Sequence, residues 1–309
     1  MIVSPDKSLK VDPVVFDIIK HIKSEIPLVP ITRLENFQFN TDLLNLDRYI
    51  ILNFCEFDWN FEWDTTPVFG KNVHSFREKF IGDEWSRLIE FVDNRSPILT
   101  FQRELLKKDV RENILPIEFP AFNEIPEIES KEKFNSRPLE LFYNWGLSNP
   151  MRPKLQGDIW HGMSKYGYAL CDNLSHPTFD NFLNYEKGRR WLSVNSQWHS
   201  RYKIADILKI NGMSKLSVSL FGSGRKCFRN TEASVNSLMV MPEDNFAWTY
   251  EWVDGYNCIK FKSDDYVEEL NRYSQEDHYI SYVYGVNTCK KYYLPNYISH
   301  LEKIIRECV

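Results

Sequence analysis

The chain has 309 residues, of which 43% are hydrophobic, 15% aromatic and 26% charged, and it carries a formal net charge of -5. This balance is that of a globular protein large enough for two domains, and it excludes a disordered chain. The acidic charge excludes a broad basic face for nucleic acid or anionic membranes, so any anion site must be local.

The thiols and imidazoles are dispersed along the chain. The six cysteines include no C-x-x-C pair and the seven histidines form no cluster, so the sequence contains no zinc signature. Scattered cysteines predict reduced thiols and a cytoplasmic protein. We find no apolar stretch of membrane-spanning length and no signal-peptide pattern at the start, and therefore expect no membrane span. Because the net charge is acidic, we expect no nucleic acid partner.

The first third alternates helical and extended patterns. Residues 11–26 carry apolar residues at helical spacing after an Asp-Pro pair, which predicts a helix. The continuous apolar run Tyr49–Phe54 indicates a buried parallel strand. A helix is expected within 83–94, a strand within 96–105 and a short extended piece within 113–122. This βαβ-like rhythm predicts a first Rossmann-like domain.

A second domain follows an acidic, proline-marked segment. We interpret Phe122–Pro138 as the linker between a domain at 1–137 and a domain at 138–309. The alternating rhythm then restarts. Strands are expected within 139–146, 189–196 and 216–222, and helices within 149–167, 198–215, 229–241 and 294–308. The last helix is strongly amphipathic and is expected to pack back on the first domain.

The segment SVSLFGSGRKCFRNTEASVNSLMVM, residues 217–241, places a glycine loop between a strand and a helix. In open α/β sheets, ligands lie beyond the carboxyl ends of the strands, where the next helix starts. Gly222 and Gly224 remove side chains, so a ligand can approach the backbone N–H groups. The fragment is neither G-x-G-x-x-G nor a Walker loop.

The charges of this fragment fit a phosphorylated ligand that contains a ribose. Arg225, Lys226 and Arg229 add positive charge where a phosphate would sit. Glu232, in the first turns of the helix, can accept hydrogen bonds from two vicinal hydroxyls. A glycine-containing turn followed by a solvated, charged helix start explains the same residues without any ligand.

The fragment resembles the C-terminal motif of GT-B glycosyltransferases, particularly the exostosin-like family. The motif is a serine in the strand, a glycine loop, an arginine and an acidic residue plus alanine that open a helix. It is matched at Ser219, Gly222, Arg229, Glu232 and Ala233, and the match covers residues 200–262. The family's small-Cys-Ile-Pro-Val run after the helix is replaced here by NSLMVMPED. The resemblance implies an α/β fold of two Rossmann-like domains with a cleft between them.

The resemblance also implies which residues bind the nucleotide-sugar donor. The acidic residue would face the ribose and the glycine loop the diphosphate, with a second strand-end loop at 146–154 and a glycine turn within 247–262. The predicted donor-binding residues are Gly146, Ser148, Arg152, Lys154, Gly222, Ser223, Gly224, Arg225, Arg229, Glu232, Tyr250 and Trp252. A proline-rich turn with a solvated arginine and a β-hairpin packed on the core remain the alternatives for the two added segments.

The first domain is expected to bind the acceptor and to supply any general base. The segment NFCEFDWNFEWD leaves the end of a buried strand with carboxylates between tryptophans. An inverting transfer needs a carboxylate or histidine to take the proton from the attacking hydroxyl. The predicted catalytic residues are Asp58 and Glu56, and the predicted acceptor-binding residues are Trp59, Trp63, Asp64 and Arg103. His74 and Glu104 are secondary candidates, and an acidic surface loop with anchoring tryptophans is the alternative.

These patterns together predict a glycosyltransferase of the hexosyl or pentosyl type. It would move a sugar from a UDP-sugar, such as UDP-xylose, to a hydroxyl of a glycan acceptor. By analogy with the family the transfer would be inverting, and it would need no metal or other cofactor. Cations and a helix N-terminus would offset the charge of the departing diphosphate. The alternatives are a carbohydrate-binding protein without catalysis and another nucleotide-using enzyme of Rossmann type.

Overall fold

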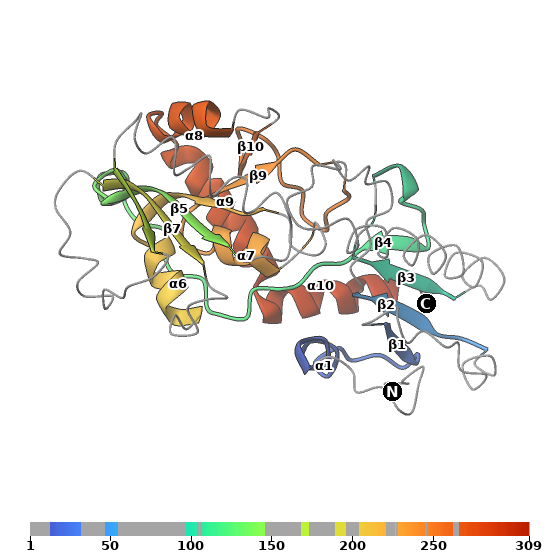
Figure 1. Ribbon diagram of the computed structural model, residues 1–309. Coiled ribbons are helices and arrows are strands. Elements are labelled where there is room, and N and C mark those ends of the chain that lie inside the picture. The colour runs from blue at the N-terminus through green and yellow to red at the C-terminus, as the bar shows by residue number, and fades with distance from the viewer. Residues whose placement is uncertain are drawn as a thin grey trace, which may run out of the picture.

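The computed structural model describes residues 13–31, 47–54, 97–103, 105, 107–145, 168–172, 189–195, 204–220, 226, 228–244, 246–261 and 266–308. Within these residues the chain forms two parallel sheets with helices packed on them (Figure 1). No helix in the described ranges is both long enough and apolar enough to cross a bilayer.

The first sheet has the strand order β1-β2-β3-β4, and all its neighbours are parallel. Its strands are β1 Leu28–Ile31, β2 Ile50–Asn53, β3 Leu99–Gln102 and β4 Ile114–Pro116, preceded by helix α1 Pro13–Ile19. Every residue of β2 and β3 is buried. A parallel strand covered on both faces has a continuous apolar sequence, so the prediction of a buried parallel strand at 49–54 is confirmed.

The second sheet has the order β10-β9-β8-β5-β7-β6, again all parallel. Its strands are β5 Leu139–Trp145, β6 Tyr168–Asp172, β7 Arg189–Asn195, β8 Ser214–Val218, β9 Leu238–Pro242 and β10 Ile259–Phe261. The chain leaves β5 for β6 and β7 on one side, then crosses to β8 on the other. The topological switch point therefore lies between β5 and β8.

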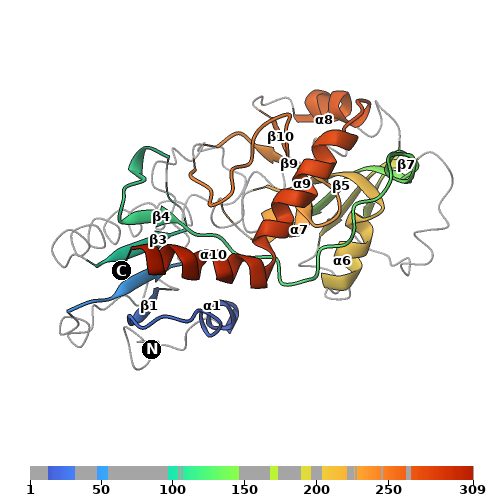
Figure 2. The ribbon, with the colours of Figure 1, turned by 180° about the vertical axis from the view of Figure 1, so that it is seen from behind.

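Helices cover the second sheet and connect it to the first. They are α6 Ile204–Asn211, α7 Phe228–Ser234, α8 Tyr266–Ser274, α9 Tyr279–Tyr292 and α10 Leu294–Glu307. Seen from both sides, α10 runs from the second sheet along the first (Figure 2). Its buried side chains Tyr297, Ile298, Leu301 and Ile305 belong to one hydrophobic cluster with Leu52 and Phe101 of the first sheet. The amphipathic stripe of the last helix is thus buried against the first half of the molecule.

The segment interpreted as a linker contains a short helix, α3 Lys131–Asn135. The Ser130 side chain caps it by accepting a hydrogen bond from Lys133 N at 3.3 Å, and Phe134 is buried. Capping and one buried aromatic order a stretch whose composition is that of a linker. The domain boundary at 137/138 stays a prediction.

The sequence did not predict β1, β6, β9, α8 or α9. The helix expected within 229–241 ends at Ser234, and the apolar residues after it form the strand β9 instead. The hairpin proposed as an alternative for 247–262 is not formed, because β10 pairs in parallel with β9. The Asp254–Gly255 turn does form, with Gly255 at φ 72°. The helices expected within 83–94 and 149–167 lie outside the described residues.

Candidate functional site

The two predicted binding loops begin at neighbouring points of the second sheet. β5 and β8 pair in parallel with Tyr143 opposite Val218, so both strands end at the same edge. This edge of the switch point is where open α/β sheets bind ligands. The loop residues themselves lie outside the described part of the chain: Gly146, Ser148, Arg152, Lys154, Gly222, Ser223, Gly224 and Arg225.

Ser219 marks the exit of β8 at this edge. Its backbone N–H donates to Val240 O at 2.8 Å, which continues the pairing with β9 by one residue. The side chain is buried, and its hydroxyl oxygen has no hydrogen-bond partner among the described residues. Buried hydroxyls normally have a partner. Water or a bound ligand at this edge would supply the missing partner of Ser219.

Helix α7 brings Arg229 and Glu232 together one turn apart. Arg229 Nη1 lies 3.3 Å from Glu232 Oε2, and the exposed fractions of the two side chains are 13% and 17%. Burial raises the pKa of Glu232 above its ordinary value, and the positive charge of Arg229 only partly opposes this. The carboxylate of Glu232 is suited to accept hydrogen bonds from hydroxyl groups. The guanidinium of Arg229 beside it is suited to pair with an anion.

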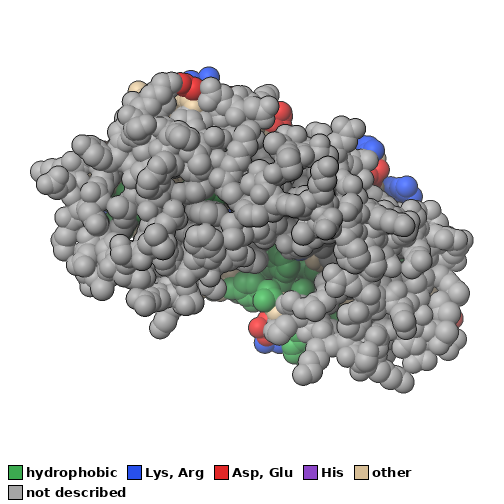
Figure 3. All heavy atoms as spheres, in the orientation of Figure 1, with side chains coloured by type: hydrophobic (Ala, Val, Ile, Leu, Met, Phe, Trp, Pro, Cys, Tyr) green, Lys and Arg blue, Asp and Glu red, His purple; other side chains and the backbone are tan. Residues whose placement is uncertain are grey.

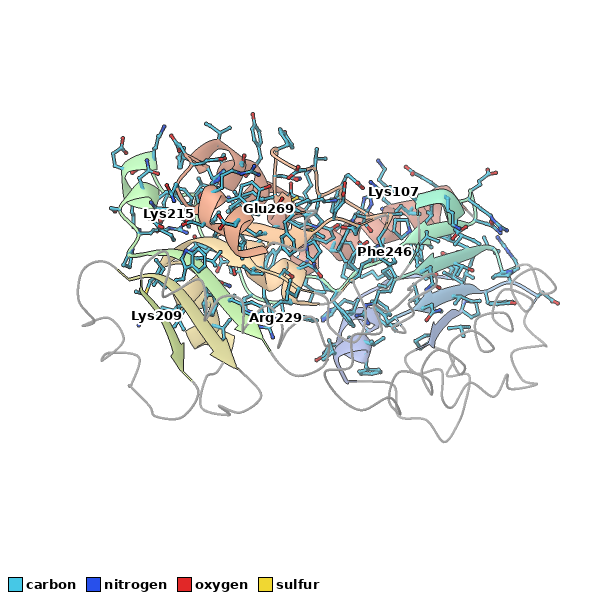
Figure 4. All side chains as sticks on the ribbon, turned by 45° about the horizontal axis from the view of Figure 1, so that its top comes forward. Lys107, Lys209, Lys215, Arg229, Phe246 and Glu269 are labelled. Atoms are coloured by element: carbon cyan, nitrogen blue, oxygen red, sulfur yellow. The ribbon has the colours of Figure 1, made fainter. Side chains whose placement is uncertain are left out.

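Buried polar contacts fix α7 in place. Asn211, the last residue of α6, donates from Nδ2 to Glu232 O at 2.8 Å. Its Oδ1 accepts a hydrogen bond from Ser217 Oγ of β8 at 2.8 Å. In Figure 4, Arg229 lies at the ends of the strand arrows, on the side that faces the first half. The Arg229–Glu232 pair is thus held at the carboxyl edge by its own sheet and by α6.

Lys226 does not present its charge to this edge. Its ammonium is buried, lies 2.5 Å from Glu118 Oε1 and stands 4.9 Å from the centre of the Trp248 ring. The prediction that Lys226 adds positive charge where a phosphate would sit is therefore wrong, because Glu118 neutralises it. Of the three cations predicted to face a phosphate, Arg225 and Arg229 remain.

Sequence reasoning missed Glu118 as a residue of this region. It follows β4 and is buried, and its carboxylate accepts hydrogen bonds from Thr249 N and from the Tyr297 hydroxyl. The signal available was a single carboxylate inside the otherwise apolar and proline-rich run ILPIEFPAF. A carboxylate in such a run must be paired if it is buried.

Arg103 directly follows β3 and is fully buried. Its Nε donates to the backbone carbonyl of Lys226, and Nη1 donates to Phe54 O at 3.0 Å. The guanidinium carbon stands 4.6 Å from the centre of the Phe119 ring. These contacts give Arg103 a positioning role between the two sheets. Acceptor binding by Arg103 stays a prediction without support from these contacts.

Tyr250 and Trp252 pack at the α9–α10 junction. Trp252 is 1% exposed and stacks on Tyr292 with ring centroids 5.9 Å apart. Tyr250 is partly buried, edge-on to Tyr292 at 5.1 Å, with Lys291 Nζ 5.4 Å from its ring centre. Burial raises the pKa of the Tyr250 hydroxyl. Trp252 is thus a core side chain in this structure, and the prediction that it lines a sugar pocket gains no support.

The segment with the predicted catalytic and acceptor residues starts at the same meeting point. It begins after Phe54, whose carbonyl is bound to Arg103, and Arg103 in turn contacts Lys226 of the second half. The predicted residues of this segment and the secondary candidates lie outside the described residues: Glu56, Asp58, Trp59, Trp63, Asp64, His74 and Glu104.

Figure 3 shows one face of the molecule, on which hydrophobic side chains are visible in a hollow.

The described residues contain no group of three or more His, Cys, Asp or Glu side chains that could hold a metal ion. The expectation of transfer without a metal is not tested by this observation and stays a prediction.

No protein-family model matches the sequence, and a search of curated proteins gave no match. Solved structures do resemble the chain. A crystal structure of TarM has a TM-score of 0.50 at 12% identity, and covers 94% of this chain and 57% of its own. A mutant of S. aureus TarM in complex with fondaparinux, alpha-GlcNAc-glycerol and UDP has a TM-score of 0.50 at 14% identity, covering 94% and 58%. The GtfA/B complex has a TM-score of 0.51 at 8% identity, covering 96% and 59%.

These structures are GT-B glycosyltransferases, and the chain has their fold: α/β, with two Rossmann-like domains. The predicted fold class is thereby confirmed. The chain spans less than three fifths of the length of these structures, with 57%, 58% and 59% covered. The exostosin-like subfamily stays a prediction.

Proposed function

We propose that the chain is a glycosyltransferase that moves a sugar from a nucleotide-diphosphate donor to a hydroxyl of a glycan acceptor. The observation that carries this proposal is the Arg229–Glu232 pair, largely buried on α7 after the carboxyl end of β8. That position adjoins the switch point of the second sheet in a GT-B fold. The pair supplies the two chemistries that a nucleotide needs, a carboxylate for hydroxyls and a guanidinium for phosphate.

Within this proposal, Glu232 accepts hydrogen bonds from the ribose hydroxyls, and Arg229 faces the diphosphate. Binding a ligand with hydroxyl donors would offset the desolvation that raises the pKa of Glu232. The glycine loop at 222–225 would bring backbone N–H groups to the phosphates. Arg225 and Arg229 would stabilise the departing diphosphate, so no metal ion is required for that step.

We assign the acceptor to the first half, where Asp58 or Glu56 would act as general base in an inverting transfer. Their segment leaves the carboxyl end of β2, and Arg103 places that end against residue 226 of the second half. An acceptor hydroxyl bound there would lie opposite a donor sugar held by the second sheet. Trp59, Trp63 and Asp64 would then contact the acceptor sugar.

A UDP-sugar is the proposed donor. The resemblance to the exostosin-like family implies UDP, and the S. aureus TarM mutant was crystallised with UDP and alpha-GlcNAc-glycerol. For this chain a pentosyl or a hexosyl donor, such as UDP-xylose or UDP-galactose, satisfies the same ribose and diphosphate contacts. Slow hydrolysis of a single compound in a panel of nucleotide sugars would identify the donor.

Isothermal titration with UDP tests the site directly. Glu232→Ala and Arg229→Ala are each expected to weaken UDP binding by about 1–3 kcal/mol, the cost of losing a charged hydrogen-bond partner. Lys209→Ala on α6 and Glu268→Ala on α8 are the matched controls, because both residues are exposed on outer helices and should leave the affinity unchanged.

Three results would contradict the proposal. Equal UDP affinity in the wild type and in both site variants would remove the Arg229–Glu232 pair from the site. Thermal stabilisation by ATP or NAD but not by UDP would indicate another nucleotide-using enzyme. Glycan binding without any nucleotide binding would indicate a carbohydrate-binding protein.

A further inference from the structure

A buried ion pair joins the loop after β8 to the first half of the molecule. Lys226 Nζ lies 2.5 Å from Glu118 Oε1, and the exposed fractions of the two side chains are 1% and 4%. The Glu118 carboxylate also accepts from Thr249 N at 3.2 and 3.3 Å and from the Tyr297 hydroxyl at 3.1 Å. A carboxylate with this many donors is held rigidly, and it holds Lys226 in turn.

The backbone of the same residue is held as well. Arg103 Nε donates to the carbonyl oxygen of Lys226, while its Nη1 donates to Phe54 O at 3.0 Å. Glu118 follows β4 and Arg103 follows β3, so both anchors stand at the carboxyl end of the first sheet. Residue 226 is therefore fixed to the first sheet through its side chain and through its main chain.

Residue 226 also lies between the two parts of the proposed nucleotide site. The glycine loop at 222–225 precedes it, and α7 with Arg229 and Glu232 begins two residues later. Neighbouring Cα atoms are about 3.8 Å apart, so the position of residue 226 constrains the start of α7 two residues later. The geometry of a site on the second sheet thus depends on groups that belong to the first.

We propose that Glu118 and Lys226, together with Arg103, form a positioning device that makes nucleotide affinity depend on docking of the first half. The proposal rests on the proposed function, since it concerns the same nucleotide site. Neither Glu118 nor the ammonium of Lys226 touches the ligand; they act by holding residue 226, which lies between the glycine loop and α7 in the sequence. A buried ion pair is a costly way to gain stability alone, because well-packed apolar residues serve that purpose as well or better.

The test compares Glu118→Gln with Glu129→Gln. Glu129 also pairs with a buried cation, Arg137, but at the opposite edge of the second sheet. Both variants are expected to lower the melting temperature. Only Glu118→Gln should raise the Kd for UDP, by about 3- to 30-fold, the range for substitutions that act on a ligand through other residues. Amide hydrogen exchange at 219–228 should accelerate in Glu118→Gln and stay unchanged in Glu129→Gln.

The double variant Glu118→Gln/Lys226→Met separates positioning from stability. The double variant removes both charges, and the amide oxygen at position 118 can still accept the hydrogen bond from Thr249 N. Its melting temperature should therefore be higher than that of Glu118→Gln, in which the Lys226 charge is left buried and unpaired. UDP affinity should remain low, because the side chain of residue 226 no longer holds it to the first sheet and only the Arg103 contact to its carbonyl oxygen remains. Recovery of UDP affinity together with stability would overturn the proposal, as would wild-type affinity and exchange in Glu118→Gln.

Failure of the proposed function gives a different result. If the wild-type protein binds no UDP, the nucleotide assignment falls, and hydrogen exchange alone decides on the positioning device. Faster exchange at 219–228 in Glu118→Gln, but not in Glu129→Gln, would still support it. Equal exchange in the wild type and both variants would overturn it.

Discussion

At the amino edge of the second sheet, Arg137 has a partner for each of its nitrogens. It pairs with Glu129, donates to Ser214 O and Asn236 O at 2.6 Å each, and lies over the ring of Tyr282 at 4.9 Å. At the carboxyl edge, the Glu232 carboxylate has one ion-pair partner among the described residues, Arg229 at 3.3 Å. The same sheet thus carries a saturated charge cluster at one edge and an incompletely paired carboxylate at the other.

The two carboxylates respond to burial with opposite net pKa shifts. Burial tends to raise the pKa of Glu129, but the hydrogen bond from Lys133 and the charge of Arg137 outweigh it, and the pKa is lowered. For Glu232, burial prevails over the charge of Arg229, and the pKa is raised. Glu129 in its charged form therefore stabilises the fold, whereas charged Glu232 costs stability.

This difference separates a charge that the protein itself satisfies from a charge whose remaining partners a ligand would supply. The hydrogen bonds of Arg137 tie the first residue of β8 to Asn236, two residues before β9, and use all of its nitrogens within the protein. The carboxyl ends open onto the switch point, where a ligand can supply further partners for Glu232. Perturbed carboxylates cluster at functional sites for this reason.

Arg137→Met is the largest expected effect and tests the amino edge. Removing Arg137 leaves the carbonyls of Ser214 and Asn236 without this donor and leaves Glu129 with Lys133 alone. We expect a loss of about 3–5 kcal/mol in the free energy of unfolding. Urea denaturation measures it. Arg272→Met on the exposed face of α8 is the matched control and should change stability by less than about 0.5 kcal/mol.

UDP affinity decides whether Arg137 is structural only. The folded fraction of Arg137→Met should bind UDP as the wild type does, because the hydrogen bonds of Arg137 lie at the edge away from the carboxyl end of β8. Weaker UDP binding at a temperature where the variant is fully folded would contradict the separation of the two edges.

Gly285→Ala is the next largest effect and tests the close packing of α9. A Cβ at this position would stand 2.8 Å from Asn257 O, a backbone atom, and 3.6 Å from Leu238 at the start of β9. Alanine gains about 1 kcal/mol of helix propensity, but overpacking costs about 1–3 kcal/mol, so we expect a net loss of stability in urea unfolding. Asn287→Ala, exposed on the same helix, has a propensity gain without the clash and should be slightly stabilising.

Much of the fold could be predicted because its signals are local. The apolar run at 49–54 and the stripe of Tyr297, Ile298, Leu301 and Ile305 specify a buried strand and an amphipathic helix by periodicity alone. α9 was missed because its aromatic and polar residues give it little amphipathic contrast, and six of its residues are buried on a face shared with β9 and α7.

The site was predictable in type but not in its partners. The motif correctly placed Arg229 and Glu232 on a helix after a strand, because strand, loop and helix are contiguous in sequence. The pairing of Lys226 with Glu118 joins residues 108 positions apart. No local pattern encodes it, so Lys226 looked like a phosphate ligand until the three-dimensional structure placed it.

The smallest expected effect is a difference in how the free energy of unfolding of Glu232→Gln and Glu129→Gln depends on pH. It contrasts the two edges of the sheet most directly. The folded pKa of Glu232 lies above the ordinary 4.5, so wild-type stability falls as pH rises from 4.5 through that raised value. Glutamine removes this loss, and Glu232→Gln should gain stability relative to wild type over the same interval. UDP affinity should be weaker in Glu232→Gln, and most clearly at the higher pH, because only the wild type then has a carboxylate to accept the ribose hydroxyls.

Glu129→Gln should give the opposite slope. The folded pKa of Glu129 is lowered, so its contribution is present above the ordinary 4.5 and is lost as pH falls through the lowered value. The variant should therefore be less stable than wild type at neutral pH and should approach it in acid. Urea unfolding across the acidic to neutral range measures both differences. Parallel slopes for the two variants would contradict the opposite pKa shifts of Glu129 and Glu232, and with them the contrast between the two edges of the sheet.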